Sequence, residues 1–214
     1  MDWYTIFKDF AAPVVALCGV IATTLFAFAG LRTFDRWKRE KLEEKRIDVA
    51  IDALAIAYEA QLAFEAIRSR LVSADECADM KVGGAPAANN QRGQHEGPRA
   101  VLRRVAEQKP FFDKVLSLEP KFVAVFGKDK DTIFERLFSA RQQVIATAQV
   151  LIDDYRIDPE PEKFESRNQR VKWRRQIFAS RGIVDPEDEV GKLLQQFRGE
   201  IEELCRPIVD RSFK

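Results

Sequence analysis

The chain of 214 residues has a single histidine and three cysteines, and this scarcity excludes several kinds of site. Zinc sites need grouped Cys and His ligands, and a histidine-based triad needs a positioned imidazole. Cys18, Cys77 and Cys205 lie far apart, are odd in number and form no C-x-x-C pair. They provide no disulfide framework, which fits a reducing compartment, and each is interpreted as a small buried hydrophobe. We expect no metal and no cofactor.

The sequence also lacks the short motifs that indicate common chemistries. No Walker loop, G-x-G-x-x-G, G-x-S-x-G, H-E-x-x-H or EF-hand pattern occurs. Adjacent carboxylates, as at Asp153 and Asp154, do not face each other on a helix and are interpreted as solvated edges. A net charge of +1 with 32% charged residues disfavours a dedicated nucleic-acid binder. We therefore expect a non-enzymatic protein with no small-molecule substrate.

One uncharged apolar run is present, over residues 10–31. About 22 residues at about 1.5 Å each span roughly 33 Å, enough for a bilayer core of about 30 Å. Pro13 falls in the first turn, where a missing N–H is tolerated, and Trp3 and Trp37 flank the run as interface aromatics do. The pattern predicts a transmembrane helix over 10–31 after a short external N-terminus, residues 1–9.

A cleaved signal peptide is the alternative, since Ala27-Phe28-Ala29 resembles an A-x-A cleavage site. The leader carries Asp2 and Asp9 and has no basic n-region, and the apolar run is longer than a usual h-region. A basic cluster follows the run: Arg32, Arg36, Lys38, Arg39, Lys41, Lys45 and Arg46. Such clusters stay on the cytoplasmic side, so we expect a membrane anchor with the N-terminus outside and the C-terminal domain in the cytoplasm.

Small residues recur along one stripe of this run at steps of three and four. They are Ala12, Ala16, Gly19, Thr23, Ala27 and Gly30. Such a stripe lets two membrane helices approach closely, which favours self-association or docking on another membrane protein. An alanine-rich helix also shows such a stripe by chance, and the sequence leaves both interpretations open. The expected partners are membrane lipid and either a second copy or another membrane protein.

Beyond the run, residues 32–46 are charged nearly all round and predict a solvated juxtamembrane helix. Residues 47–214 predict a cytosolic helical bundle, interrupted by a disordered loop at 81–98, where Gly, Pro, Asn and Gln dominate. Several alanines between residues 50 and 60 suggest close helix packing. The first bundle helix is expected to bury one apolar stripe, made of Ile47, Ile51, Leu54, Tyr58 and Leu62 and extended around the helix by Phe64, Ile67 and Leu71.

Three further helical segments are expected downstream. One begins near Arg99 and ends near Pro120, and the following "FVAVF" is interpreted as a short buried helix or an extended connector closed by Gly127. A long helix from about Asp131 has its apolar positions at helical spacing, namely Ile133, Leu137, Ala140, Val144, Ala148, Leu151 and Tyr155. The last helix is expected to start at the N-cap Asp185. With no alternation of strands and helices, the fold class is all-α: an N-terminal transmembrane helix continuing into an antiparallel bundle of four to five helices.

A basic helix, "FESRNQRVKWRRQIFASRG", precedes the last one. It supplies a candidate interaction patch: Arg167, Arg170, Trp173, Arg174, Arg175 and Arg181. The patch could bind anionic lipid, nucleic acid or an acidic protein surface. The alternative, which we favour, is that its arginines pair with carboxylates in flanking segments or on the last helix.

The stretches "WKREKLEEKRIDVAIDALAIAYEAQLAFEAIRSRL", "KFVAVFGKD" and "ARQQVIATAQVLIDDY" resemble an uncharacterised group of small bacterial single-pass membrane proteins with a helical cytosolic domain. The resemblance covers about residues 10–156 and implies the layout of anchor and bundle and that the membrane is a bacterial inner membrane. It implies no activity and no functional residues. The first hypothesis is a membrane-anchored module for protein–protein interaction or self-assembly. The second is a membrane-surface sensor or effector, such as a stress or phage-response accessory, that binds anionic lipid or nucleic acid through residues 167–181.

Overall fold

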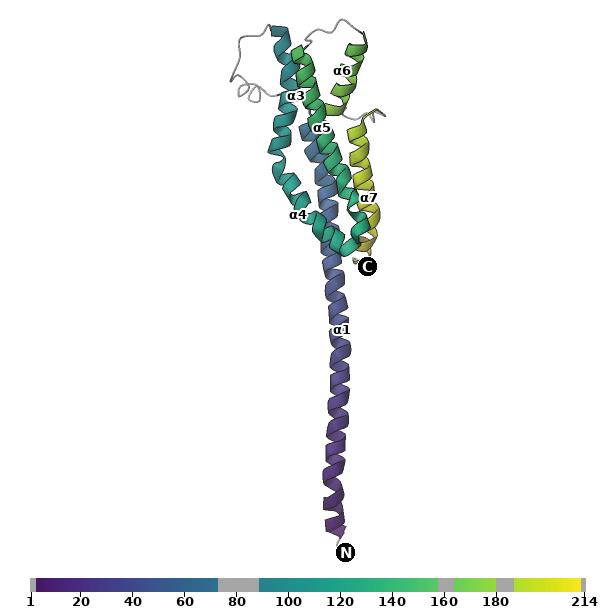
Figure 1. The fold of residues 1–214 in the computed structure, drawn as a ribbon. Coiled ribbons are helices and arrows are strands. Elements are labelled where there is room, and N and C mark those ends of the chain that lie inside the picture. Colours follow the sequence, from purple (N-terminus) through teal and green to yellow (C-terminus); the bar gives the residue numbers. More distant parts are fainter. Residues whose placement is uncertain (1–2, 73–88, 158–163, 180–186, 213–214) are drawn as a thin grey trace. The chain divides into compact units, whose positions relative to one another are not determined.

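The computed structural model describes residues 3–72, 89–157, 164–179 and 187–212. These residues contain helices and short connecting turns but no strand, so the all-α prediction is confirmed for them. They form six α-helices, against the four to five expected after the anchor. The elements are α1 (Trp3–Ile67), α3 (Asn89–Glu107), α4 (Lys109–Phe126), the 3₁₀ turn η2 (Lys128–Lys130), α5 (Thr132–Ile157), α6 (Phe164–Ile177) and α7 (Glu189–Ser212) (Figure 1).

The chain divides into two compact units, Met1–Arg46 and Ile47–Lys214. The first consists of the N-terminal part of α1, whose charged end carries ion pairs three and four residues apart, as between Arg36 and Glu40 at 3.1 Å. No helix long and apolar enough to cross a membrane is found among the residues that the structure describes. Within the predicted membrane segment, the side chains of residues 10–14, 16 and 18 lie outside the described set.

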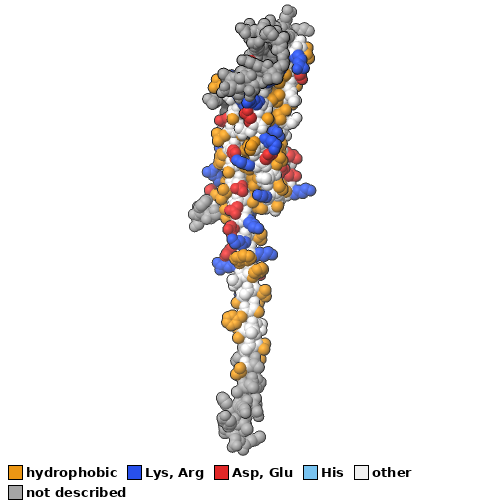
Figure 2. Space-filling view, turned by 90° about the vertical axis from the view of Figure 1, so that its left-hand side faces the viewer, with side chains coloured by type: hydrophobic (Ala, Val, Ile, Leu, Met, Phe, Trp, Pro, Cys, Tyr) orange, Lys and Arg blue, Asp and Glu red, His pale blue; other side chains and the backbone are white. Residues whose placement is uncertain are grey.

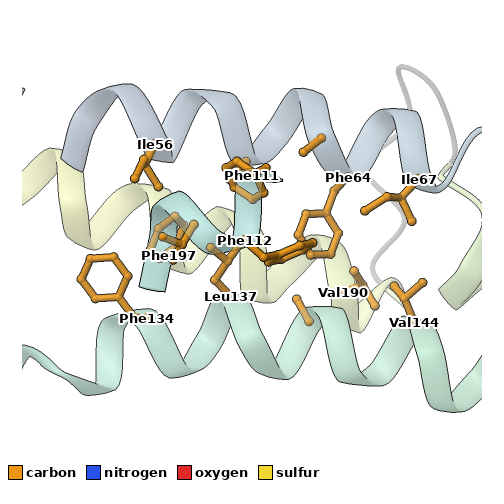
Figure 3. Packing of buried hydrophobic residues seen from close by; sticks show 14 of the residues in the cluster. Ile56, Phe64, Ile67, Phe111, Phe112, Phe134, Leu137, Val144, Val190 and Phe197 are labelled. Atoms are coloured by element: carbon orange, nitrogen blue, oxygen red, sulfur yellow. The ribbon is translucent and has the colours of Figure 1, made fainter. Parts of the chain in front are cut away.

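The second unit is a helical bundle in which α5 lies alongside α3, α6 and α7 (Figure 1). All seven apolar positions predicted for α5, from Ile133 to Tyr155, are buried, so that prediction is confirmed. Side chains of α1 and α5 point toward one another across the core, with Phe112 of α4 between them (Figure 3). Because these helices come from distant parts of the sequence, the core ties the whole second unit together.

Phenylalanine rings form much of this core. Phe112 packs edge-on against Phe64 of α1, with ring centroids 6.1 Å apart. A second group joins Phe122 of α4, Phe134 of α5 and Phe197 of α7 through edge-on contacts of 5.3 and 5.8 Å. Edge-to-face packing at such distances adds to the stabilisation gained from burial alone. Three of the bundle helices therefore meet at one aromatic cluster.

The buried face of α1 differs from the predicted stripe, of which Ile51, Tyr58 and Leu62 are exposed. The helix instead buries its alanines, Ala50, Ala53, Ala57 and Ala60, together with Ile56, Ala63, Phe64 and Ile67. Small side chains shorten the distance between packed helix axes, so the alanine face lets α1 approach its neighbours closely. The stripe prediction was therefore wrong for Ile51, Tyr58 and Leu62. In its extension Leu71 is exposed, whereas Phe64 and Ile67 are buried as predicted, and the alanines that were expected to pack are buried too.

Two expected breaks are helical in the structure. Helix α4 continues through Pro120 to Phe126 and ends before Gly127, whose φ of 106° favours glycine. Pro120 lies on the exposed side of α4, where water can bond the carbonyl that the missing N–H leaves free. Residues 89–98, expected to belong to a disordered loop, form the start of α3, and residues 81–88 lie outside the described residues.

The last helix begins later than the sequence suggested. Helix α7 starts at Glu189, and Asp188 accepts a hydrogen bond of 2.9 Å from the backbone N–H of Gly191. This is the geometry of an N-cap, so Asp188 caps α7 where the sequence had suggested Asp185, which lies outside the described residues. Asp188 also binds Arg68 from the end of α1 at 2.8 Å. One carboxylate therefore both caps α7 and links it to α1.

Candidate interaction surfaces

The part of α1 in the first unit carries large apolar side chains that no described residue covers. Every position from Gly19 to Arg46 is exposed. The large hydrophobic side chains between Val15 and Trp37 are 51–79% exposed. No charged residue lies between Val15 and Leu31. On the face in view hydrophobic side chains stand out along this part of the helix, and a band of mixed charges follows (Figure 2). Apolar exposure on all sides of a helix marks a surface that meets lipid or another protein.

Three threonine hydroxyls of this segment form hydrogen bonds within their own helix. The hydroxyls of Thr23, Thr24 and Thr33 donate to backbone carbonyls three or four residues earlier, at 2.7–3.0 Å. A hydroxyl that bonds its own helix needs no water, so these threonines are compatible with an apolar surrounding.

The predicted small-residue stripe lies partly within the described side chains. Gly19, Thr23, Ala27 and Gly30 are exposed, while the side chains of Ala12 and Ala16 lie outside the described set. A Cβ placed on Gly19 or Gly30 would meet nothing within 4 Å. The stripe is therefore open for close approach by another helix.

The candidate patch on α6 does not present a uniform basic face. Arg170 is buried, its Nε donates to a carboxylate oxygen of Asp154 on α5, and its guanidinium lies 4.8 Å from the ring centre of Tyr155. Trp173 is partly buried against the core. These two residues attach α6 to the bundle. Arg170 is paired with a carboxylate, as the favoured interpretation expected, but that carboxylate lies on α5 and not in a flanking segment or on the last helix.

The remaining patch residues are more accessible. Arg167 and Arg174 are exposed, and Arg175 is half-buried and paired with Glu187. Arg181 lies outside the described residues. Of the exposed members, Arg174 lies next to Arg175 on the pocket described below, whereas Arg167 lies near the other end of α6.

A groove of about 520 Å³ lies between α1 and α7 in the second unit. Its floor includes Ala57 and Phe64, and its sides are charged. Arg198 crosses it, donating to Gln61 Oε1 and Glu202 Oε1 at 2.9 Å each. The bond from Arg198 is the main cause that holds the pKa of Glu202 below its usual value. Because these charges are paired within the groove, it shows no preference for an anionic or cationic ligand.

Metal ions need a set of several ligand side chains grouped together. Among the described residues, no group of three or more His, Cys, Asp or Glu side chains could hold a metal ion. Cys205 is buried, and burial raises the pKa of its thiol to about 11, so at neutral pH it stays protonated and is a poor nucleophile. Comparison with protein-family models, with curated proteins and with solved structures finds no match for this chain.

Proposed function

We propose that the protein is a non-enzymatic, membrane-anchored helical module that associates with itself or with another membrane protein. In this proposal residues 10–31 cross a bacterial inner membrane, with the N-terminus outside and the bundle in the cytoplasm. The observation that carries it is the unbroken exposure of large apolar side chains along the first unit. In water this surface would be unfavourable at about 25 cal/mol per Å², and lipid removes that penalty.

The charge pattern supports the proposed orientation. The uncharged run ends at Leu31, and the basic cluster begins with Arg32. Arg36, Lys41 and Arg46 are only partly neutralised by neighbouring glutamates, since these pairs are highly exposed and contribute little free energy. Positive charge directly after an apolar helix keeps that end on the cytoplasmic side and attracts anionic headgroups.

Membrane anchoring is testable by extraction of the full chain from bacterial membranes. The wild-type protein should stay in the membrane pellet after an alkaline carbonate wash and enter solution with detergent. Replacing Ile21 and Leu25 together with arginine should move most of the protein out of the carbonate-resistant fraction. Each arginine near the bilayer centre opposes insertion by about 2.5–3.5 kcal/mol.

Phe34 and Trp37 provide the matched control for this experiment. They are 58% and 53% exposed, close to the 51% and 65% of Ile21 and Leu25, but they follow the apolar run. The double variant Phe34→Arg, Trp37→Arg should remain carbonate-resistant. Release of the wild-type protein by carbonate, or equal release of both double variants, would contradict the proposed anchor. Protease added outside spheroplasts should leave the C-terminal domain intact, and its digestion would reverse the orientation.

Self-association through the small-residue stripe gives a second prediction. Gly19→Leu and Gly30→Leu should each reduce cross-linked dimer in native membranes about fivefold or more, because a bulky side chain separates the helices. A side chain at either glycine meets nothing within 4 Å in the single chain, so the change acts on the contact between chains. Ala29→Leu adds bulk beside the stripe and should leave the dimer yield unchanged. Equal yields from all three variants would exclude the stripe as the contact.

A further inference from the structure

A second pocket, of about 450 Å³, lies where the chain after α1 meets α6 and α3. Arg70 lines it from the first of these segments, and Arg174 and Arg175 line it from the last turn of α6. Val171 and Phe178 provide apolar surface, and Glu96 of α3 is the one carboxylate among the described lining residues. Three guanidinium groups from two distant parts of the sequence therefore converge on one pocket.

The two basic walls are held together by the backbone and by Arg68. The N–H of Ala179 donates to the carbonyl of Arg68 at 3.0 Å, which joins the end of α6 to the end of α1. The buried guanidinium of Arg68 donates to the carbonyl of Arg175 at 3.0 Å and to Asp188 at 2.8 Å. Arg70 follows two residues later, so its position beside the last turn of α6 is set by these bonds.

Two of the three arginines lack an ion pair with a carboxylate, which Arg136 and Arg170 of the same bundle have. Arg175 pairs with Glu187, but Arg70 and Arg174 are exposed, and the side chain of neither makes an ion pair or a hydrogen bond within the described ranges. Elsewhere in the bundle, Arg136 pairs with Glu200 of α7 at 2.7 Å, and Arg170 pairs with Asp154. Three guanidinium groups lie beside Glu96 and Glu187, so an excess of positive charge remains at the pocket, and a bound anion would lower the free energy of that arrangement.

The shape and lining indicate which anion fits. A guanidinium presents parallel N–H donors that match two oxygens of a phosphate. On the apolar side of the pocket, α3 and the ring of Phe178 are tightly packed, since a Cβ on Gly97 would lie only 3.0 Å from that ring. A volume of about 450 Å³ exceeds the needs of a bare phosphate and is within the usual range of about 300–1,000 Å³ for organic ligands. We propose that this pocket binds a phosphate ester that carries an apolar or aromatic group, such as a nucleotide.

Titration calorimetry on the full-length chain in neutral-lipid nanodiscs tests the proposal, with ATP, glycerol 3-phosphate and inorganic phosphate as probes. ATP should bind at submillimolar concentration, and the other two probes at least tenfold more weakly, because they lack the aromatic group. Arg70→Ala and Arg174→Ala should each weaken ATP binding about tenfold, and raising the salt concentration should weaken it further. Arg156→Ala removes an exposed arginine from the last turn of α5 and should leave ATP binding unchanged.

The alternatives give distinct results. Equal affinity for ATP and glycerol 3-phosphate would overturn the aromatic requirement and point to a lipid headgroup, and equal affinity for inorganic phosphate would indicate a simple anion site. No heat with ATP up to millimolar concentration, or ATP binding that survives the double variant Arg70→Ala, Arg174→Ala, would overturn the pocket itself. Circular dichroism and thermal unfolding confirm that each variant is folded, which the exposure of both arginines favours.

Discussion

Phe134→Ala is expected to lower the free energy of unfolding of the bundle by about 3–5 kcal/mol, because a fully buried aromatic side chain is lost and a cavity remains. Phe134 is 0% exposed. Its ring lies between Phe122 of α4 and Phe197 of α7, at 5.3 and 5.8 Å between centroids. Phe122 is also stacked on Phe126, with ring centroids 4.4 Å apart, and filling the space would disturb that contact, so the core is expected to relax only partly.

The measurement is thermal unfolding of the full-length chain, followed by circular dichroism. A loss of 3–5 kcal/mol in a unit of this size corresponds to a fall in melting temperature of about 6–20 °C. Leu116→Ala is the control, because Leu116 lies on α4 of the same bundle and is 53% exposed. The control should change stability by less than about 1 kcal/mol. Similar effects of the two variants would mean that the aromatic cluster does not join α4, α5 and α7 as described.

The burial pattern of α5 could be predicted from the sequence because this helix has one clearly apolar face and no second face that could be buried in its place. Its apolar residues repeat at three and four positions, and Gly127 and Pro159 bound the segment on either side. The corresponding reading of α1 failed because that helix has two candidate faces. Ile51 and Leu62 are larger than Ala53 and Ala60, so hydrophobicity alone selects the wrong face. Which face is buried depends on how closely the neighbouring helices approach, and spacing along one helix does not contain that information.

The candidate patch shows the same limit for charged residues. The sequence suggested that the α6 arginines pair with flanking glutamates, and Arg175 does pair with Glu187. Arg170 pairs instead with Asp154, near the end of the preceding helix. Arg70 was not a candidate at all, because it is far from α6 in sequence and reaches the pocket only through the packing of α1 against α6. Two arginines close together near a helix end, Arg68 and Arg70, were the only sequence signal available for it.

Among substitutions of charged residues, Arg68→Ala is expected to have the largest effect and to lower the free energy of unfolding by about 3 kcal/mol. Removing one partner of a buried ion pair usually lowers stability by about 3–5 kcal/mol, and the lower end applies because Asp188 keeps 17% exposure and its bond to Gly191. The loss includes the bond to the carbonyl of Arg175, which becomes a buried acceptor without its donor. Local loosening should appear as faster amide hydrogen exchange in the last turn of α6 and the first turn of α7.

A double-mutant cycle separates the ion pair from the other roles of these two residues. Arg68→Met keeps much of the side-chain volume and relieves the buried Nε, which has no hydrogen-bond partner, so it should be milder than alanine. Asp188→Asn keeps an N-cap for α7, since asparagine caps as well as aspartate, and removes only the charge. The combined variant should be more stable than the sum of the single losses predicts, by about 1–2 kcal/mol, because the two side chains are in contact. If the losses in free energy of unfolding of the two single variants add up to that of the double variant within about 0.5 kcal/mol, the Arg68–Asp188 contact contributes nothing to joining α1 and α7. The walls of the pocket lined by Arg70, Arg174 and Arg175 would then be held together without this ion pair.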